Sequence, residues 1–509
     1  MPQRVASTPD LVRGPRRWRR AALALATVLA VATLPTSAGA DVIGVEAVVT
    51  SALPPGTPWS IGQLNDGDYA VGSYEIGVTS YSLAWGNDVG VVLPSDLAVA
   101  PDVAARMSFS RVNEHGLAGG LITAPNPSEA RLFVADLRTK AVELLDTGTA
   151  IAGWIEDIGA DGTVVGTVFD DPGGNPSHAV AWVGASHTLV HPEDLDNGSR
   201  IADVNAHGLA AGWFVDDLGN RHPATWDLAA GTAVRDLAPI TGFFAGGNRI
   251  EVSDRGDVLI GLGSPGSSEY NDVVVLGGTD QLVRLYPIGT GMWTELNDRG
   301  QAAYAIVNGN DLPNVVVVVD LVTGARTELV HIPWLAFDFN DRGQVAANVL
   351  GLDRFVLWDP IHGWVDLGDA GGRGVQFNSM NSVGHLVGTY VDTRTPWLGT
   401  VQFGPGPPQA LAATSTDGAV DLTWAPPVSL GDAALSGYRV SRDGAFVADV
   451  AAGTTSFHDV AVVAGTTVSY TVTAVTEFGE SSPTPAVEVL VVAAPSPPDP
   501  LVIEPRFTG

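Results

Sequence analysis

The stretch Val204-Asn205-Ala206-His207-Gly208-Leu209-Ala210-Ala211-Gly212 carries the pattern that decides the fold. An apolar residue precedes Asn205, and Gly208 follows three positions after it, ahead of a run of small and apolar residues. An Asn side chain can bond its own backbone to start a turn, and Gly adopts a positive φ at no steric cost. The pattern therefore predicts a tight hairpin between two β-strands.

This hairpin pattern recurs along most of the chain. The position held by Gly208 recurs 41 to 48 residues apart, at 68, 116, 162, 208, 256, 300, 343 and 384. The first copy has Asp68 in place of Gly, which an Asp tolerates at small cost. Each unit holds four strand-like runs separated by turn-forming residues, in the fourth unit at 200–205, 209–215, 222–228 and 233–240. Four short strands per unit of this length are typical of a β-propeller blade.

The two ends of the repeat region predict how the propeller closes. The eighth unit has only three strand-like runs before residue 404, and residues 41–50 form a lone apolar run before the first unit. We expect this first run to supply the missing outer strand and to join both ends of the chain in one blade. The prediction is an all-β, eight-bladed propeller over residues 41–403, with seven blades as the alternative. An open solenoid would leave strand edges unpaired.

The repeat units resemble the HAF-type extracellular repeats, a family of secreted bacterial proteins. The resemblance covers about residues 56–403 and rests on the Asn-x-x-Gly turn followed by a His-Ala-aromatic-x-Trp-like strand. That strand reads His178-Ala179-Val180-Ala181-Trp182 in one unit and His222-Pro223-Ala224-Thr225-Trp226 in the next, and neither is a full match. The resemblance implies an exported β protein and no defined biochemical activity.

A second module follows the stiff segment Gly404-Pro405-Gly406-Pro407-Pro408. Residues 409–492 resemble a fibronectin type III domain, with the alternating strand Ala419-Val420-Asp421-Leu422-Thr423-Trp424 and a hairpin at Arg442-Asp443-Gly444. The resemblance implies an immunoglobulin-like β-sandwich, which commonly acts as a spacer or an accessory binder. The Pro-rich tail, residues 493–509, has the composition of a disordered segment.

The N-terminal residues 1–40 have the pattern of a secretory signal peptide. A basic region ending at Arg20 precedes an uncharged run of about 14 residues, and Ala38-Gly39-Ala40 supplies the small residues of a cleavage site. The run is shorter than the roughly 20 residues that cross a bilayer. We expect cleavage before Asp41, and a secreted, extracellular protein without a membrane anchor.

The charge of the chain argues against two classes of partner, nucleic acids and anionic membranes. The net charge is −30, and removing the six Arg and one Asp of residues 1–40 lowers it to −35, with Lys140 as the remaining lysine. Nucleic-acid binding needs Lys and Arg contacts to phosphate, and anionic membranes attract basic segments, so we expect neither partner. The expected partner is an extracellular protein or a polysaccharide, bound by a monomer.

Polar residues recur two positions before the turn Asn position of each unit, where a closed propeller would bring them into a ring around its channel. They are Gln63, Arg111, Asp157, Asp203, Glu251, Glu295, Asp338 and Ser379. Ca²⁺ prefers several carboxylate and carbonyl oxygens, so Asp157, Asp203, Glu251, Glu295 and Asp338 form a candidate cation site. The alternatives are a hydrated channel lining and carboxylates that cap backbone amides.

Two sets of tryptophans invite different interpretations. Trp85, Trp182, Trp226 and Trp358 end third strands, and we expect them to pack between neighbouring blades. Trp154, Trp293 and Trp334 stand near the loops that enter the inner strands, where an exposed ring could stack on a sugar. Packing between blades is the alternative for this second set also.

The sequence contains no catalytic constellation that stands out, and we assign no catalytic residue and no cofactor other than the candidate Ca²⁺. We favour a secreted binding or interaction protein, with propeller loops presenting the binding face. The alternative is a secreted hydrolase or lyase that acts on polysaccharide with acids at the channel mouth, since paired carboxylates can perform glycoside chemistry.

Overall fold

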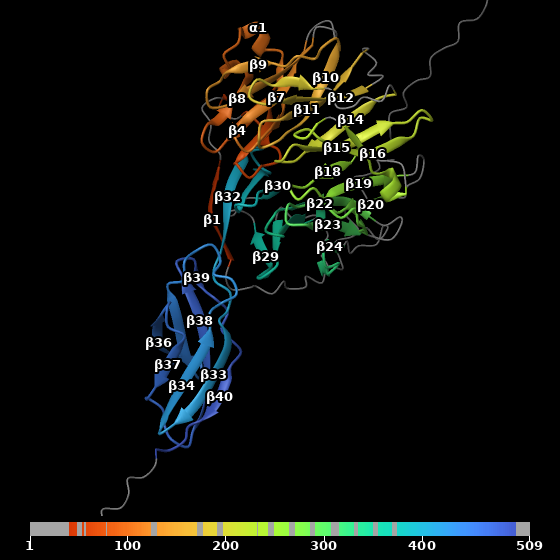
Figure 1. Ribbon diagram of the computed structural model, residues 1–509. Coiled ribbons are helices and arrows are strands. Elements are labelled where there is room, and N and C mark those ends of the chain that lie inside the picture. The colour runs from red at the N-terminus through yellow and green to blue at the C-terminus, as the bar shows by residue number, and fades with distance from the viewer. Residues whose placement is uncertain are drawn as a thin grey trace, which may run out of the picture. The chain divides into compact units, whose positions relative to one another are not determined.

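The computed structural model describes residues 40–494, except 48–52, 55–56, 78, 124–129, 171–176, 191–196, 232, 243–248, 264–269, 286–290, 307–314, 330–333, 350–354 and 369–373. The signal-peptide prediction for residues 1–40 and the tail prediction for 493–509 fall almost entirely outside this part of the chain. The described residues form an all-β protein of antiparallel sheets (Figure 1). Within them, no helix is long and apolar enough to cross a bilayer.

Eight four-stranded sheets account for the repeat region in the described part of the chain. Seven of them follow chain order strand by strand, as the repeat predicts. They are β2–β5 (Trp59–Ile61, Tyr69–Ile76, Thr79–Gly86, Gly90–Val92), β6–β9 (Met107–Val112, Leu117–Ile122, Arg131–Asp136, Val142–Leu144), β10–β13 (Ala152–Ile158, Val164–Phe169, Ser177–Val183, Thr188–Val190), β14–β17 (Ser199–Val204, Leu209–Val215, Arg221–Asp227, Val234–Asp236), β18–β21 (Ile250–Val252, Val258–Gly263, Tyr270–Val275, Leu282–Arg284), β22–β25 (Gly291–Leu296, Gln301–Ile306, Val315–Asp320, Arg326–Leu329) and β26–β29 (Trp334–Phe339, Val345–Val349, Phe355–Asp359, Gly363–Gly368).

The eighth sheet takes its outer strand from the other end of the chain. Its order is β1-β32-β31-β30, with β30 at Val375–Met380, β31 at His385–Tyr390, β32 at Pro396–Phe403 and β1 at Ala40–Ala47. Figure 1 draws β1 in red beside the blue β32. The two strands pair antiparallel from Ala40 opposite Phe403 to Ala47 opposite Trp397. The sequence prediction that the first strand completes the last sheet is therefore confirmed.

The repeated turns have the backbone conformation that the sequence requires. All seven glycines of the repeat, from Gly116 to Gly384, have φ between 75° and 98°. Asp68 stands at the equivalent position with φ 62°. A β-branched or bulky residue would be strained there, so the turn position accepts Gly or, in the first repeat, Asp.

The hydrophobic core of the repeat region lies between neighbouring sheets. Trp182 is fully buried among residues of its own sheet and of β8, and Trp226 is fully buried against β11 and β12. Trp85 packs with Val387 of β31, so the first sheet also shares a core with the last. The packing prediction holds for these three tryptophans, whereas Trp358 is only partly buried.

The fourth strand of the fourth repeat differs from the sequence prediction. The fourth run of the fourth repeat, expected over residues 233–240, is a three-residue strand, β17, followed by the short helix α2 (Ala238–Thr241). Pro239 lies in the first turn of α2, where its missing N–H costs no hydrogen bond. A second short helix, α1 (Pro101–Ala104), and the 3₁₀ turn η1 (Pro94–Asp96) follow β5.

Residues 409–490 form a separate two-sheet sandwich. One sheet has the order β33-β34-β37 (Gln409–Thr416, Ala419–Ala425, Ser456–Asp459). The other has the order β36-β35-β38-β39 (Ala445–Ala451, Gly437–Arg442, Thr467–Thr476, Gly479–Glu480), and β40 (Val487–Leu490) pairs with β38. Trp424 of one sheet and Tyr438 of the other meet edge to face at 5.3 Å in the shared core. This Trp therefore belongs to the core, as the alternating strand predicts.

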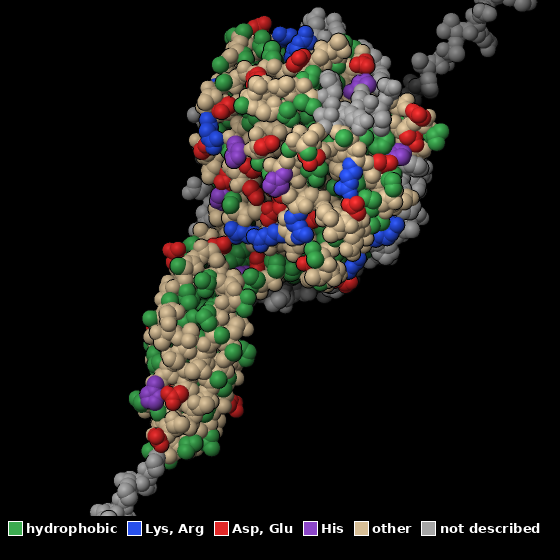
Figure 2. Space-filling view, in the orientation of Figure 1, with side chains coloured by type: hydrophobic (Ala, Val, Ile, Leu, Met, Phe, Trp, Pro, Cys, Tyr) green, Lys and Arg blue, Asp and Glu red, His purple; other side chains and the backbone are tan. Residues whose placement is uncertain are grey.

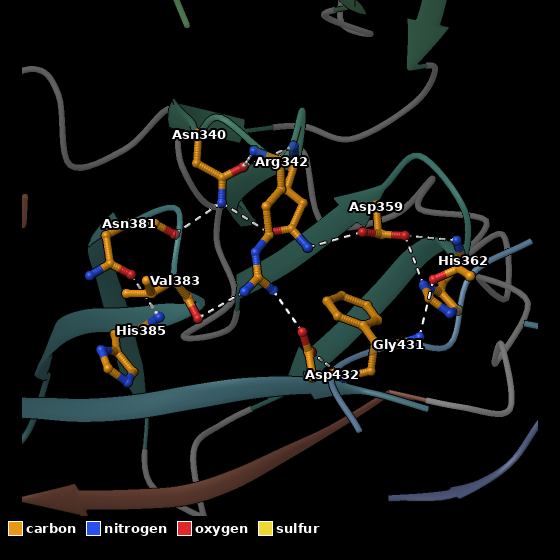
Figure 3. A network of polar contacts seen from close by, with 12 residues as sticks. Asn340, Arg342, Asp359, His362, Asn381, Val383, His385, Gly431 and Asp432 are labelled. Atoms are coloured by element: carbon orange, nitrogen blue, oxygen red, sulfur yellow. Dashed lines mark hydrogen bonds and ion pairs between the residues drawn. The ribbon is translucent and has the colours of Figure 1, made fainter. Parts of the chain in front are cut away.

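The segment 404–408 is largely buried, with Gly404, Pro405, Gly406 and Pro408 shielded from solvent. Asp432 accepts a hydrogen bond from the Phe403 backbone N–H at 2.8 Å and forms an ion pair with Arg342 at 3.0 Å (Figure 3). A Cβ on Gly431 would lie 2.2 Å from the Phe403 carbonyl oxygen, so the loop 429–432 approaches the segment as closely as Gly allows.

Candidate functional site in the central cavity

A cavity of about 1040 Å³ lies where the first strands of the eight sheets run into their turns. Pockets that hold small ligands are typically about 300–1,000 Å³. Every sheet contributes to the wall through the residue that precedes its turn Asn position. These residues are Leu64, Val112, Ile158, Val204, Val252, Leu296, Phe339 and Met380.

The polar residues that the sequence singles out meet at this cavity. Seven of the eight line it, and Ser379 lines an adjoining cavity of about 290 Å³ together with Gln63, Glu251, Glu295 and Asp338. The five acidic members of the predicted cation site are therefore brought into one ring of wall positions. Among the described residues, however, no group of three or more His, Asp or Glu side chains is arranged to hold a metal ion.

A β-bulge precedes the ring position in several sheets. The strand pairing skips one residue just before Arg111, Asp157, Asp203 and Ser379. A bulge bends its strand and re-aims the next side chain. Periodicity along a strand cannot reveal it, because strict alternation of side chains breaks at that residue.

Three ring residues bond the backbone of the following sheet. Asp203 accepts the Val252 N–H at 2.7 Å, and Asp338 accepts the Met380 N–H at 2.8 Å. Asp157 accepts the Val204 N–H at 3.3 Å. Each donor is the residue just before the turn Asn position of the next repeat. Of the three interpretations that the sequence leaves open, these bonds support the one in which the carboxylates cap backbone amides.

Ser379 makes the equivalent bond across the junction of the chain ends. Its Oγ accepts the Leu64 N–H at 3.1 Å and donates to Asp338 at 2.8 Å. The first sheet is thereby hydrogen-bonded to the eighth through the same wall position that links the interior sheets.

Burial changes the acidity of this ring. Burial raises the pKa of Asp203 well above its usual value, and the neighbouring carboxylate of Asp157 adds to the effect. Burial also raises the pKa of Asp338. The pKa of Glu295 rises to about 8 because the side chain is buried and lies near Glu251. Arg249 reaches both glutamates, with 2.8 Å to Glu251 and 3.4 Å to Glu295.

The turn asparagines link the repeats to one another. Asn340 accepts the N–H groups of Arg342 and Gln344 within its own turn, and its Nδ2 donates to the Asn381 carbonyl oxygen at 3.0 Å (Figure 3). Asn113, Asn205, Asn297 and Asn381 donate to the same backbone position of the next repeat, and Asn65 to the residue just before it. The turn pattern in the sequence accounts for the bonds that Asn accepts within its own turn and does not reveal this second bond. The recurrence of Asn is the signal that the sequence offers, since an ionised Asp only accepts and a Ser hydroxyl uses one oxygen for both roles, whereas the Asn amide has separate donor and acceptor atoms.

A set of acidic side chains follows the turn asparagines along the cavity wall. Asp298 accepts the Asp254 N–H and Asp341 accepts the Asp298 N–H, at 2.5 and 2.7 Å. Burial raises the pKa of Asp298 to about 6, helped by the charges of Asp341 and Asp254. Burial likewise raises the pKa values of Asp341 and Glu114. We call Asp66, Glu114, Asp254, Asp298 and Asp341 the acidic turn ring.

Of the three candidate stacking tryptophans, Trp154 is the one whose side chain lies in the described part of the chain. Trp154 on β10 is 46% exposed, packs edge to face on Phe169 at 4.6 Å and donates its Nε1–H to Glu156. It does not line either cavity. The side chains of Trp293 and Trp334 lie outside the described residues, so their stacking role stays a prediction.

The cavity wall is strongly polar and carries an excess of negative charge. Eleven acidic and three arginine side chains line it. On the face of the molecule drawn in Figure 2, acidic side chains are interspersed with histidines and arginines. Most of the acids of the cavity wall are half-buried, and partial shielding from water strengthens the attraction of an ionised carboxylate to a positive group. The arrangement can therefore bind and partly desolvate a cationic ligand.

No family model and no curated protein matches the chain. Among solved structures, the twitchin kinase region from C. elegans is 24% identical over 18% of this chain and 17% of that one, with a TM-score of 0.16. The chain thus spans about a sixth of that structure. A Fn3-like protein from Clostridium thermocellum is 22% identical over 19% of this chain and 98% of that chain, with a TM-score of 0.15. TolB from Acinetobacter baumannii is 12% identical over 65% of this chain and 80% of that chain, with a TM-score of 0.32.

Proposed function

We propose that this chain is an exported binding protein, built as a closed eight-bladed β-propeller that is followed in the sequence by a fibronectin type III module. The ligand enters the central cavity from the side of the turns and carries positive charge. The sandwich acts as a spacer or an accessory binder. Catalysis is not part of this proposal.

The observation that carries the proposal is the cavity itself. Its wall takes residues from all eight sheets, and acidic side chains outnumber arginines there by eleven to three. The closed propeller is supported by the pairing of β1 with β32 and by the Leu64–Ser379 hydrogen bond between the first and last sheets. Export is supported by the pattern of residues 1–40 and by the acidic, Lys-poor composition.

The hydrogen bonds of the acids favour binding over hydrolysis. A glycosidase needs one carboxyl group free to donate a proton and a second one free to attack or to activate water. Here Asp157, Asp203 and Asp338 each accept a backbone N–H of the next sheet. These three carboxylates thus already take part in holding neighbouring sheets together.

The test is a binding screen of residues 41–509 against an array of glycans and short peptides at low salt, with mass spectrometry of the recovered ligands. We expect retention of amine-bearing or Lys/Arg-bearing members and no cleavage product. The double variant Asp298→Asn and Asp341→Asn keeps both backbone acceptors and removes two charges, so it should weaken retention at least tenfold. Glu488→Gln on the exposed strand β40 is the matched control and should retain ligands like the unaltered protein. Exclusive retention of neutral or anionic members would contradict the proposal, and cleaved glycans would favour the hydrolase or lyase.

A further inference from the structure

Arg111 breaks the acidic pattern of the ring positions. It is exposed, lies on β6 and lines the large cavity. Two backbone carbonyl oxygens hold its guanidinium group. Its Nε donates to the Glu156 carbonyl oxygen at 2.5 Å, and its Nη1 donates to the Ser110 carbonyl oxygen at 2.8 Å.

The other two arginines of the cavity wall are already neutralised. Arg200 binds both carboxylate oxygens of Glu156 at 2.8 and 3.0 Å, and Arg249 pairs with Glu251 and Glu295. Arg111 forms no ion pair with any carboxylate in the described part of the chain. Carbonyl oxygens orient a guanidinium group without cancelling its charge, so Arg111 keeps its full charge and its Nη2 donor for a ligand.

The chemistry of a guanidinium group selects the partner. Its planar donors match the two oxygens of a carboxylate and form charge-assisted hydrogen bonds with them. A held guanidinium loses little conformational entropy when such a group binds. Arg111 is therefore a preorganised site for a carboxylate.

Acidic side chains share the same cavity wall. Glu114 follows Arg111 by three residues, and its Oε2 is buried without a hydrogen-bond partner among the described residues. Asp66 of the acidic turn ring also lines the cavity. Glu114 is close enough to the charge of Asp66 and of Asp157 for both to act on it electrostatically. A ligand held by Arg111 through a carboxylate thus meets acceptors for an ammonium group nearby.

We propose that the ligand is zwitterionic, a short peptide whose carboxylate binds Arg111 and whose ammonium groups face Glu114 and Asp66. This assignment rests on the proposed function, because it concerns the same cavity. The proposed function requires only that the ligand carry positive charge. Arg111 adds the requirement that the ligand also carry a carboxylate.

The test uses the peptide Ala-Ala-Lys in two forms, with a free C-terminal carboxylate and with a C-terminal amide, titrated calorimetrically into residues 41–509. We expect the free acid to bind at least tenfold more tightly than the amide. Arg111→Gln should abolish that difference and leave the amide affinity unchanged or slightly higher. Arg131→Gln is the matched control, because Arg131 is exposed on the same sheet and does not line the cavity.

Each other result has a defined meaning. Equal affinity of the acid and the amide in the unaltered protein would overturn the role of Arg111 and leave the cationic ligand of the proposed function intact. Retention of cationic glycans on the array, without binding of either peptide, would overturn the peptide assignment alone. No retention of any cationic member would overturn the proposed function itself. A lower melting temperature of Arg111→Gln with an unchanged acid-to-amide ratio would assign Arg111 a structural role only.

Discussion

Asp68 accepts a hydrogen bond from Asn381 Nδ2 at 2.7 Å, although the two residues are 313 positions apart in the chain. His385 also reaches the same Asp68 oxygen through Nδ1, at 2.6 Å. Asp68 is the one repeat position among the eight where the turn glycine is replaced. The departure from the repeat thus occurs where the first sheet meets the last, and its carboxylate bonds the two ends of the chain.

Replacing Asp68 by Gly restores the repeat pattern, but we expect it to lower stability. Gly relieves the cost of a positive φ, about 1 kcal/mol, but removes hydrogen bonds to a charged acceptor that contribute about 1.5–3 kcal/mol each. The net loss should be about 2–5 kcal/mol in the free energy of unfolding, measured by urea denaturation. Asp417→Gly is the control, because Asp417 is exposed with φ 52°, and it should be neutral or slightly stabilising. A stabilised Asp68→Gly variant would contradict a closing role for Asp68.

Removal of residues 41–47 should destabilise the whole repeat region. It leaves the edge of β32 unpaired from Trp397 to Phe403 and exposes the core beneath it. We expect the melting temperature to fall by more than about 5 °C and the variant to associate through the open edge. Calorimetry and light scattering measure both effects, and removal of residues 495–509 serves as the control truncation. An unchanged melting temperature would show that β1 does not seal the last sheet.

Stability should decrease as the pH rises from about 5 to 8. The pKa of Asp298 is raised to about 6 and that of Glu295 to about 8, so the folded chain binds more protons than the unfolded chain across this window. The free energy of unfolding then falls with rising pH. The hydrogen bond to Asp68 raises the pKa of His385, whose contribution is complete below the usual pKa near 6.5 and is lost as the pH rises through the raised value. All three groups act in the same direction.

The measurement is the melting temperature at pH 5 and pH 8, which we expect to differ by several degrees. Glu295→Gln keeps an acceptor for Arg249 and cannot titrate, so it should reduce the slope. Glu488→Gln should leave the slope unchanged. A melting temperature that rises between pH 5 and pH 8 would contradict the raised pKa values of Asp298 and Glu295.

Calcium should not change the stability of the mature protein. Asp157, Asp203 and Asp338 use their oxygens to accept backbone N–H groups, and the described residues hold no cluster suited to a metal. An ion present at one hundred times its dissociation constant would add about 2.7 kcal/mol to the free energy of unfolding. We therefore expect the same melting temperature after chelation and after restoring millimolar Ca²⁺. A clear rise with Ca²⁺ would reinstate the ring as a cation site.

Asp432→Ala should loosen the segment 404–408. The variant loses the 2.8 Å bond to the Phe403 N–H and the ion pair with Arg342. Amide hydrogen exchange at Phe403 and Gly406 should accelerate by about tenfold, since the lost bonds contribute about 1–3 kcal/mol. Glu488→Ala provides the control for a lost surface carboxylate. Unchanged exchange would mean that burial of the segment holds it without Asp432.

The sequence by itself determined the strand repeat, its turns and the joining of the two chain ends. The turns follow from local chemistry, because Asn and Gly at fixed spacing limit the backbone to one kind of turn. The joining of the chain ends follows because the eighth repeat lacks a fourth strand and residues 41–50 are the one strand-like run left to supply it. The sequence also predicts the ring positions, since matching residues of successive repeats occupy matching places around the channel.

Only the tertiary structure decided what those residues do. The carboxylate of Asp203 bonds Val252 of the next repeat, and Asn381 bonds Asn65 from the far end of the chain. Such partners depend on how neighbouring sheets are set against one another, and a bulge just before Asp203 changes which way its side chain faces. The short fourth strand β17 and helix α2 were likewise outside local prediction, because an outer strand is limited by the packing of the adjacent sheet and not by its own residues alone. In the sequence Arg111 is one more polar channel residue. Only the structure shows that its guanidinium group bonds backbone carbonyl oxygens, whereas Arg200 and Arg249 bind carboxylates.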